Sequence, residues 1–378
     1  MTLHIDSAEE PVRFLSPDGT FAPTPAAEPF LARLDALSDA DHERFYRDMV
    51  SVRAFDREAT NLQRQGEMAL FPPSEGQEGA QVGSAHAARP QDHIFPSYRE
   101  HVVGMIRGVD PVGILSLMRG VTLGGWDPTD PKNGNFHLYT LVLGSQTLHA
   151  TGYAMGQLFD GASGTGNVET DEATMVYFGD GSTSEGDVSE ALVFAASHQT
   201  PQVFFLQNNQ WAISVPVSVQ SRTPLYKRGA GFGLPSVQID GNDVLASYAV
   251  TSQFLDEART GQGPRFIEAL TYRMGAHTTS DDPTKYRTDQ ERAEWGTRDP
   301  IIRFEAYLRA RGAAESLFTS AAEDARDLCA DVRTRTLALE APDKNTIFDH
   351  VYTDEHPRMQ EQSDWLNRYE ESMTEEAR

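Results

Sequence analysis

The sequence contains a single cysteine, Cys329, among its 378 residues. One thiol cannot form an internal disulfide, and a chain without disulfides is typical of a reducing compartment. Long apolar runs are also missing, since no stretch approaches the ~18 apolar residues of a membrane span. Residues 1–36 lack the apolar core of a secretory signal and contain too many acids for a transit peptide. These absences predict a cytoplasmic bacterial protein with no membrane partner.

Basic residues are scarce relative to acidic ones. There are 32 Lys and Arg against 56 Asp and Glu, which gives a net charge of −24. This excess of acid disfavours binding to nucleic acid, so no nucleic acid partner is predicted. The acidity serves either solubility or a basic partner, and composition does not separate the two. The 39% hydrophobic and 23% charged residues are those of a globular protein, long enough for a large core.

Proline and charge patterns divide the chain into three parts. Residues 1–37 hold five prolines and scattered acids, and are predicted to form an irregular arm around the domain or a partner. Residues 38–340 are predicted to form one α/β domain. Residues 341–378 are predicted to be an extension, with a short apolar island at 347–352 and an amphipathic helix from Pro357 to Arg378.

Hydrophobic periodicity in the central part predicts alternating helices and strands. The first helix begins at Ser38 and ends near Gln65, before Gly66. Strands are then predicted at residues 175–178, 203–206, 237–243 and 265–270, and helices at 184–196 and 244–259. A charged helical region at 285–340 supplies the core candidates Trp295, Ile301, Ile302, Phe304, Leu308, Leu328, Val332 and Leu337. This alternation predicts a doubly wound, mostly parallel sheet flanked by helices.

The stretch from Met175 to Val215 has the pattern of a parallel βαβ crossover. A buried strand is followed by the turn Gly179-Asp180-Gly181-Ser182 and a helix, for which Ser184 with Asp187 is predicted to act as a capping pair. The crossover places backbone N–H groups of the turn, including those of Gly181 and Ser182, and a helix N-terminus at the carboxyl ends of the strands. An anion is predicted to bind there.

A carboxylate in that turn needs an explanation, because Asp180 would repel a bare phosphate. A magnesium ion between them resolves the conflict, since Mg²⁺ prefers one or two protein carboxylates together with phosphate oxygens. Asp180 can give a carboxylate oxygen, Asn209 at the end of the next strand an amide oxygen, and Trp211 just beyond it a backbone carbonyl. These three are the predicted metal ligands.

A dinucleotide-binding fold is the alternative for glycines between a strand and a helix. That fold needs G-x-G-x-x-G, with an acidic residue at the end of the second strand about 20 positions later. Here Gly181 is followed by Ser182-Thr183-Ser184-Glu185, and the second strand ends in Gln207-Asn208-Asn209. Neither requirement is met, so a nicotinamide site is not predicted.

The chain contains Gly179-Asp180-Gly181, then residues 182–207, then Asn208-Asn209. This pattern resembles the thiamine diphosphate signature, in which a GDG and an NN are separated by 26 residues. The continuation Gln210-Trp211-Ala212-Ile213-Ser214 is similar to the α subunit of the E1 component of 2-oxo acid dehydrogenase complexes. The likeness extends over roughly residues 40 to 355. It implies the thiamine diphosphate-binding fold, with thiamine diphosphate and magnesium as cofactors.

The resemblance also assigns residues outside the central stretch. Tyr98 and Arg99 match a pair that reaches the diphosphate, and a guanidinium and a phenol are suitable donors to phosphate oxygens. Leu143 matches a residue that packs on the aminopyrimidine ring. His277 matches a histidine at the mouth of the site, where a pKa close to neutral would suit a donor or an acid/base. No role is assigned to Glu100 or His101.

Two positions depart from the family pattern. Leu141-Val142 stand where relatives often have a Ser-Pro pair beside the substrate and, in some, a structural potassium ion, so potassium is left open. Thr278 replaces the usual serine after the histidine, and regulation by phosphorylation is not predicted there.

The resemblance implies an enzyme that decarboxylates a 2-oxo acid and transfers the acyl group to the lipoyl group of an E2 acyltransferase. A glutamate on a β subunit activates the cofactor in this family, so an α2β2 heterotetramer with the cofactor between subunits is expected. Branched-chain 2-oxo acids such as 2-oxoisovalerate are the first expectation for the substrate, and pyruvate is the second. A non-catalytic scaffold subunit with the same fold is the alternative of another class.

Overall fold

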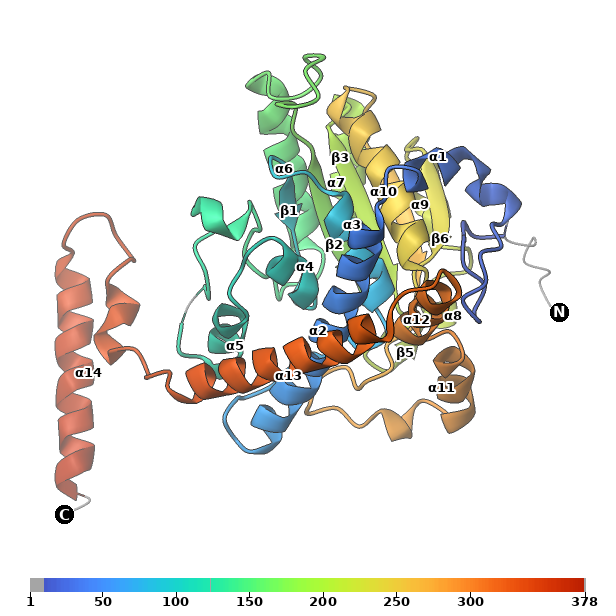
Figure 1. Cartoon of the computed structure of the whole chain (residues 1–378). Coiled ribbons are helices and arrows are strands. Elements are labelled where there is room, and N and C mark those ends of the chain that lie inside the picture. The colour runs from blue at the N-terminus through green and yellow to red at the C-terminus, as the bar shows by residue number, and fades with distance from the viewer. Residues whose placement is uncertain (1–9, 123, 377–378) are drawn as a thin grey trace.

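A five-stranded parallel sheet forms the centre of the computed structural model, which describes residues 10–122 and 124–376 (Figure 1). Its strand order is β1-β2-β3-β7-β6, and every neighbouring pair is parallel. The strands are β1 (His93–Phe95), β2 (Thr174–Gly179), β3 (Gln202–Asn208), β6 (Ser236–Asp240) and β7 (Arg265–Leu270). The predicted parallel sheet and its strands are thus confirmed, and β1 is added at one edge.

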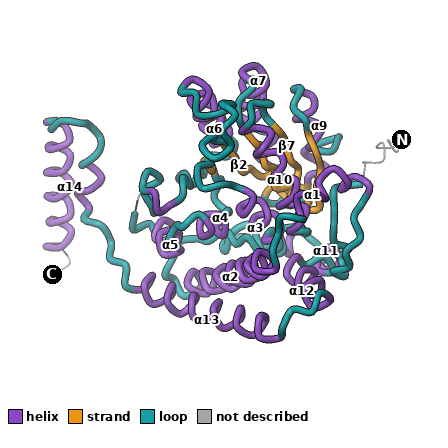
Figure 2. Tube along the Cα trace, turned by 45° about the horizontal axis from the view of Figure 1, so that its top comes forward, coloured by secondary structure: helices purple, strands orange, loops and turns teal. Residues whose placement is uncertain are grey.

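Helices cover both faces of this sheet, which is why its central strands are continuous apolar runs (Figure 2). One face carries α3 (Glu78–Ala87) and α10 (Val244–Arg259), with α2 (Asp39–Arg64), α12 (Pro300–Ala310) and α13 (Glu315–Leu337) outside them. The other face carries α6 (Ser145–Phe159), α7 (Gly186–His198) and α9 (Tyr226–Gly231). The doubly wound architecture is confirmed.

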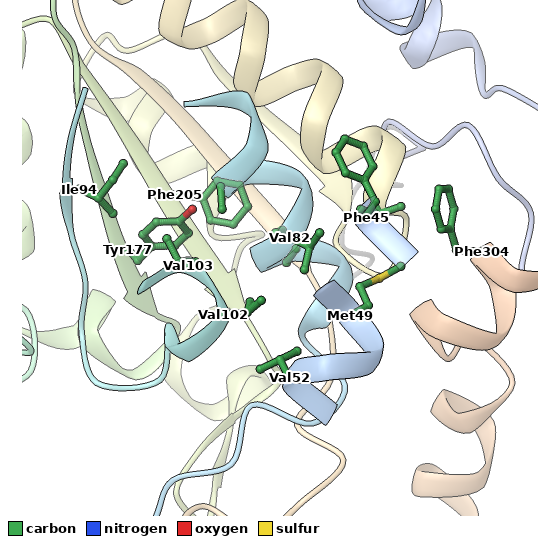
Figure 3. Close-up of a cluster of buried hydrophobic side chains, with 14 of the residues drawn as sticks. Phe45, Met49, Val52, Val82, Ile94, Val102, Val103, Tyr177, Phe205 and Phe304 are labelled. Atoms are coloured by element: carbon green, nitrogen blue, oxygen red, sulfur yellow. The ribbon is translucent and has the colours of Figure 1, made fainter. Parts of the chain in front are cut away.

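Each face of the sheet has its own hydrophobic core, because successive strand residues point to opposite sides. Tyr177 and Phe205 pack with residues of α2, α3 and α10, among them Phe45 and Val82 (Figure 3). Neighbouring strand residues such as Phe178, Phe204 and Phe266 pack on the other face with α6 and α7. Burial on both sides fixes β2 and β3, and with them the positions of the turns that follow.

The first long helix begins as the sequence predicts. The Ser38 hydroxyl accepts a hydrogen bond from the Asp41 N–H, and the Asp41 carboxylate accepts one from the Ser38 N–H, which is a capping box. The helix ends before Gly66, whose φ of +86° an L side chain rarely adopts. The buried face of α2 includes Phe45, Met49 and Val52.

The predicted cap of the central helix is wrong. Ser184 ends a 3-10 turn, η3 (Gly181–Ser184), and α7 begins at Gly186 with Glu185 as its N-cap, without a side-chain capping bond. The chain makes this extra turn before the helix because Thr183 and Glu185 each donate a backbone hydrogen bond three residues back. Ser184 is therefore exposed and lies one residue before the N-cap, where it does not cap the helix.

The N-terminal arm is more regular than predicted. Val12 pairs with Ile239 at the free edge of β6, and the Phe14 and Leu15 N–H groups donate to the buried Asp243 carboxylate at 2.6 and 2.7 Å. Two short helices follow, η1 (Pro25–Phe30) and α1 (Leu31–Leu34). The arm covers the sheet edge, which protects it from pairing with another chain.

Most of the predicted C-terminal helices are present, but two core candidates are wrong. Ile302 is 67% exposed and Leu337 is 42% exposed, because each lies on the outward face of its helix, whereas Phe304, Leu308 and Val332 are buried. The predicted helix at the end of the chain is α14 (Pro357–Glu376), which together with η5 (Lys344–Phe348) stands apart from the body (Figure 1). The remaining short elements are α4 (His101–Ile106), α5 (Pro111–Arg119), η2 (Pro131–Asn133), β4 (Trp211–Ala212), β5 (Val215–Pro216), α8 (Val217–Gln220), η4 (Pro283–Lys285) and α11 (Asp289–Gly296).

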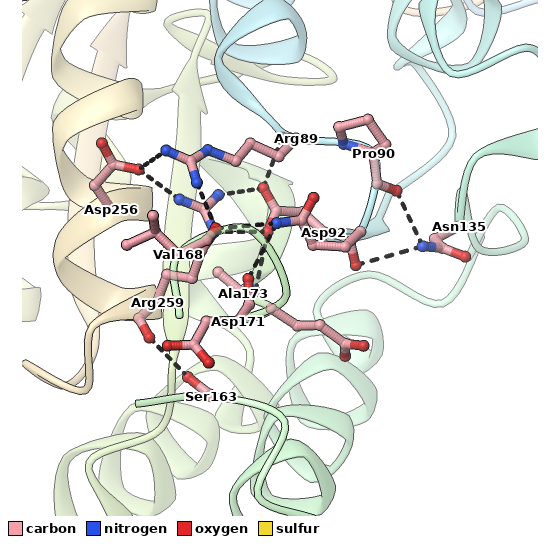
Figure 4. Close-up of polar contacts among 12 residues, drawn as sticks. Arg89, Pro90, Asp92, Asn135, Ser163, Val168, Asp171, Ala173, Asp256 and Arg259 are labelled. Carbon is pink, nitrogen blue, oxygen red and sulfur yellow. Dashed lines mark hydrogen bonds and ion pairs between the residues drawn. The ribbon is translucent and has the colours of Figure 1, made fainter. Parts of the chain in front are cut away.

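The amino end of the sheet is closed by a buried polar network around Asp92 (Figure 4). The Asp92 carboxylate accepts hydrogen bonds from the Arg89 and Ala173 N–H groups at 2.7 and 3.0 Å, and from Arg259 at 2.5 Å. Arg259 also pairs with Asp256 at 2.5 Å. Asp92 and Arg259 are at most 1% exposed, so this buried charge pair is satisfied within the fold.

Candidate active site

A cavity of about 310 Å³ lies at the carboxyl ends of β2 and β3, the edge of a parallel sheet where ligands bind in open α/β folds. Every residue that the sequence predicts for the site lines it. These residues are Tyr98, Arg99, Leu143, Asp180, Gly181, Ser182, Asn209, Trp211 and His277. The fold thus collects in one place residues that are far apart in the chain.

Two strand ends form the floor of the cavity. Asp180 follows β2, and Asn209 follows β3, whose Gln207 is paired with Gly179 in the sheet. Gly181 comes so close to the β4–β5 hairpin that an added Cβ would lie 2.8 Å from the Ala212 Cβ. Any larger residue would push the two segments apart at this point.

The hairpin after Asn209 has a strained backbone. Gln210 has φ of +75° and Ile213 has φ of +53°, in the left-handed region that a β-branched residue rarely adopts. Between them lies Trp211, whose backbone carbonyl accepts a hydrogen bond from Arg273 at 3.0 Å. Strain of this kind is typical of functional sites. One lone pair of the Trp211 carbonyl remains for another partner.

Asp180 is a buried carboxylate with no ion-pair partner among the residues that the structure describes. It is 1% exposed and accepts a hydrogen bond from the Gln220 amide at 2.9 Å. Burial raises the pKa of Asp180 to about 6. A divalent cation would stabilise the charged form, and a carboxylate, the Asn209 amide and a backbone carbonyl suit magnesium. No cluster of three His, Cys, Asp or Glu that could hold a metal occurs in the described part of the chain.

The opposite side of the cavity is cationic. Arg99 is 5% exposed, and its guanidinium donates to the Pro73 carbonyl at 2.5 Å and to the His277 carbonyl at 2.9 Å. The Tyr98 ring lies beside it, with the guanidinium carbon 5.5 Å from the ring centroid. These contacts orient Arg99 while leaving further N–H groups for an anion, because a guanidinium has five donors.

His277 differs from its prediction in one respect. Its pKa is lowered to about 3, first by burial and then by the positive charges of Arg99 and Arg273, so the predicted near-neutral pKa is wrong for the protein by itself. The Nδ1 atom lies 3.4 Å from nitrogens of both guanidinium groups. The ring is therefore neutral at physiological pH unless a bound anion offsets the two cations.

Arg273 is a site residue that the sequence did not reveal. It is 1% exposed, donates to the Ile213 carbonyl at 2.7 Å as well as to Trp211, and has a buried Nε without a partner in the described structure. Burial lowers the pKa of Arg273 to about 10. The available signal was its position three residues after β7, which is the same sheet edge as the other site residues.

Apolar side chains surround the mouth of this polar cavity. Leu143 is 38% exposed, Ile213 51% and Val215 41%, and all three line it. Leu141 and Val142, two residues and one residue before Leu143, are 65% and 71% exposed. Exposed apolar groups around a polar site indicate a surface that another molecule covers. The apolar pair 141–142 also offers no side-chain oxygen to a potassium ion.

The parallel sheet and a charged cavity beyond its strand ends define a coenzyme-binding α/β protein. The chain belongs to the dehydrogenase E1 component family, whose model matches residues 46–331. This membership implies thiamine diphosphate as the coenzyme. The residues present fit it, because cationic donors and a buried carboxylate without an ion-pair partner among the described residues line the same cavity.

The relatives compared below fall into two groups by name. The chain is 42% identical over 364 residues to the 3-methyl-2-oxobutanoate dehydrogenase subunit alpha of Mycobacterium tuberculosis, covering 94% of this chain and 93% of that protein. It is 38% identical to the pyruvate dehydrogenase E1 component subunit alpha of Acholeplasma laidlawii, over 87% of this chain and 94% of that protein. A Staphylococcus aureus protein of the latter name is 35% identical, over 73% and 72%. None of the described helices is long and apolar enough to cross a membrane.

Proposed function

We propose that this chain is the α subunit of a 2-oxo acid dehydrogenase E1, which decarboxylates a branched-chain 2-oxo acid and passes the acyl group to the lipoyl group of an E2 acyltransferase. The observation that supports it best is the convergence of distant residues. Asp180, Asn209, Arg99 and His277 line one cavity, which has an acidic half around Asp180 and a cationic half around Arg99.

The acidic half would hold magnesium. Asp180 would give a carboxylate oxygen, Asn209 its amide oxygen and Trp211 its backbone carbonyl, with diphosphate oxygens completing the shell. The Asn209 side chain is already oriented, because its Nδ2 donates to the side-chain oxygen Oε1 of Gln77 at 3.3 Å. Magnesium would remove the cost of burying the charged form of Asp180.

The cationic half would hold the diphosphate. Arg99 and Tyr98 would donate to phosphate oxygens, and the buried backbone N–H groups at Gly181 and Ser182 would add to them. When bound, thiamine diphosphate supplies the carbanion chemistry, and Leu143 would pack on its aminopyrimidine ring.

His277 would act through hydrogen bonding near the diphosphate and the acyl group. Negative charge from a diphosphate would offset Arg99 and Arg273, and so raise the pKa of His277 from the low value that these cations impose. We assign its proton to the transfer of the acyl group to the lipoyl disulfide, in which one sulfur takes the acyl group and the other is reduced to a thiol as the S–S bond breaks.

A β subunit would complete the active site. The cavity has polar groups for a diphosphate and a metal, whereas its mouth is a ring of exposed apolar side chains that includes Leu143 and Ile213. A partner would cover these and contribute the acidic residue that activates the aminopyrimidine. We propose an α2β2 heterotetramer with one coenzyme at each α–β interface, and a chain that is inactive alone.

The substrate choice is supported by similarity. The Mycobacterium tuberculosis relative named for 3-methyl-2-oxobutanoate is 42% identical over 94% of this chain, against 38% over 87% for the first relative named for pyruvate. Pyruvate is the second candidate.

Co-expression with a β subunit tests the function directly. Calorimetry should show saturable binding of thiamine diphosphate that depends on Mg²⁺, and a panel of 2-oxo acids should be decarboxylated with preference for branched chains. Absence of saturable binding would indicate a scaffold subunit instead. Full activity of the isolated chain would contradict the shared active site.

A further inference from the structure

His101 lies directly behind the Tyr98-Arg99 pair, and the proposed function gives it no role. It is the first residue of α4, and none of its side chain reaches solvent. The ring stacks on Phe71 with centroids 4.9 Å apart. Both ring nitrogens are engaged: Nδ1 lies 2.8 Å from the Tyr139 hydroxyl and Nε2 lies 2.9 Å from the Pro72 carbonyl.

The two partners determine where the proton of this imidazole resides. A carbonyl only accepts, so Nε2 carries the hydrogen and donates to Pro72, which leaves Nδ1 to accept from the Tyr139 hydroxyl. Burial lowers the pKa of His101 to about 3, and burial also raises the pKa of Tyr139 well above its usual value. At neutral pH His101 is thus a neutral ring with two fixed hydrogen bonds.

The Nε2 bond holds the segment that orients Arg99. The residue after Pro72 is Pro73, whose carbonyl accepts from the Arg99 guanidinium at 2.5 Å. A shift of the Pro72 carbonyl would therefore move the group against which Arg99 is placed. Arg99 also contacts the His277 carbonyl, so the same shift would reach the loop that carries His277.

The Nδ1 bond holds a different wall. Tyr139 is followed by Thr140, whose N–H donates to the Ser97 carbonyl at 2.8 Å, and this segment continues to Leu143 at the cavity mouth. The Tyr139 ring also packs edge-on against Trp126, at 5.1 Å between centroids. The Tyr139 hydroxyl bond to His101 is thus a second polar contact that holds residues 139–143, beside the Thr140 bond to Ser97.

We propose that His101 is a positioning residue that sets Arg99 through its Nε2 and residues 139–143 through its Nδ1, and so fixes two walls of the cavity relative to each other. The inference rests on the proposed function, because those walls would contact the diphosphate and the 2-oxo acid. His101 touches neither ligand and transfers no proton.

Four variants of the α–β complex separate the two bonds. His101→Asn places an amide near Nδ1 and has no group that reaches Pro72. His101→Gln places an amide donor near Nε2 and loses the acceptor for Tyr139. Tyr139→Phe removes the Nδ1 bond alone, and His101→Phe removes both while keeping a ring. His42→Phe is the matched control, since His42 is also buried and ring-stacked, on Phe304, but does not line the cavity.

The variants should differ in which constant they change, the Kd for the coenzyme or the KM for the 2-oxo acid. His101→Asn should raise the Kd for thiamine diphosphate with Mg²⁺ about tenfold, the effect of one lost buried hydrogen bond. His101→Gln and Tyr139→Phe should keep that Kd and raise the KM for the 2-oxo acid by about threefold to tenfold. His101→Phe should show both effects, and His42→Phe should show neither.

Hydrogen exchange of the complex without coenzyme gives a second readout. His101→Gln and Tyr139→Phe should speed amide exchange at residues 139–143, and His101→Asn should speed it at residues 74–77, which follow the two prolines. If His101→Phe only lowers Tm as His42→Phe does, or if His101→Asn and His101→Gln behave alike, the inference is wrong. If the unmodified complex binds no thiamine diphosphate, the proposed function fails, and the exchange pattern still decides the role of His101.

Discussion

The two ends of the same parallel sheet both bury charged side chains, but they treat them differently. At the amino end, Asp92 and Arg259 neutralise each other, and each has further partners from the backbone or from Asp256. At the carboxyl end, Asp180 has no ion-pair partner among the described residues and Arg273 has a buried Nε without an acceptor. The charges at the amino end are thus paired within the fold, whereas those at the carboxyl end are left with unsatisfied groups that a ligand could bind.

The physical reason is the cost of leaving a charge unpaired away from water. A closed network such as that around Asp92 is complete in the folded chain, so it serves structure. An open arrangement such as that around Asp180 is unfavourable until something of the opposite sign arrives, and burial raises the pKa of Asp180 to about 6 as a result. Perturbed carboxyl groups in a cavity are thus good indicators of function.

Breaking the amino-end network should have the largest effect. Asp92→Asn should lower the free energy of unfolding of the complex by about 3 to 5 kcal/mol, because Arg259 is left buried without its main counter-ion. Denaturant unfolding measures it. Asp160→Asn, a change on the exposed end of α6, is the control and should be neutral. A loss below about 1 kcal/mol for Asp92→Asn would mean that this network is not structural.

Removing the Asp180 carboxylate at the carboxyl end of the sheet should weaken coenzyme binding without lowering the free energy of unfolding. Asp180→Asn should weaken Mg²⁺-dependent binding of thiamine diphosphate by about 100-fold or more, since the only charged metal ligand is lost. The unfolding free energy without coenzyme should stay the same or rise, because a buried unpaired charge is gone. Calorimetry and denaturant unfolding measure the two effects. Glu190→Gln on the exposed side of α7 is the control, and unchanged coenzyme affinity in Asp180→Asn would remove the ligand assignment.

Burial of the Asp180 carboxylate without a counter-ion also predicts that the stability of the complex depends on pH. The folded-state pKa of Asp180, about 6, lies above its ordinary value of 3.8, so the folded state binds the proton more tightly. The coenzyme-free complex should therefore lose stability as pH rises from about 4 to 6, on the order of 2 kcal/mol for this group. Below pH 4 Asp180 no longer lowers the stability of the complex.

Comparison of the unfolding free energy at pH 5 and pH 7 measures this effect. The difference should be smaller in Asp180→Asn, and smaller in the unmodified complex saturated with coenzyme and Mg²⁺. An identical pH difference in all three samples would show that the charge of Asp180 is not unfavourable in the fold.

His277 should give the smallest effect. His277→Ala should slow acyl transfer about tenfold, the loss of one hydrogen bond to the reacting group, while the Kd for thiamine diphosphate changes less because Arg99 remains. Single-turnover transfer to a lipoyl domain, measured beside calorimetry, separates the two steps. Normal transfer with normal binding would make His277 structural.

The sequence by itself determined the secondary elements of the centre and the identity of the predicted site residues. Continuous apolar runs identify β2 and β3, Ser38 before a helical apolar period identifies the start of α2, and the glycine turn and amides at the strand ends identify Asp180 and Asn209. These are local signals, because each depends on residues close together in the chain. Long charged helices were less certain, as the exposure of Ile302 shows.

Tertiary structure alone decided how those residues act on one another. Arg99 and Arg273, distant in sequence, both lie within 3.4 Å of His277 and lower its pKa to about 3, which no spacing reveals. The bonds of His101 to Pro72 and Tyr139 likewise join segments about 30 to 40 residues away. Electrostatic and hydrogen-bond effects depend on distance in space and on burial, and both are set only when the chain has folded.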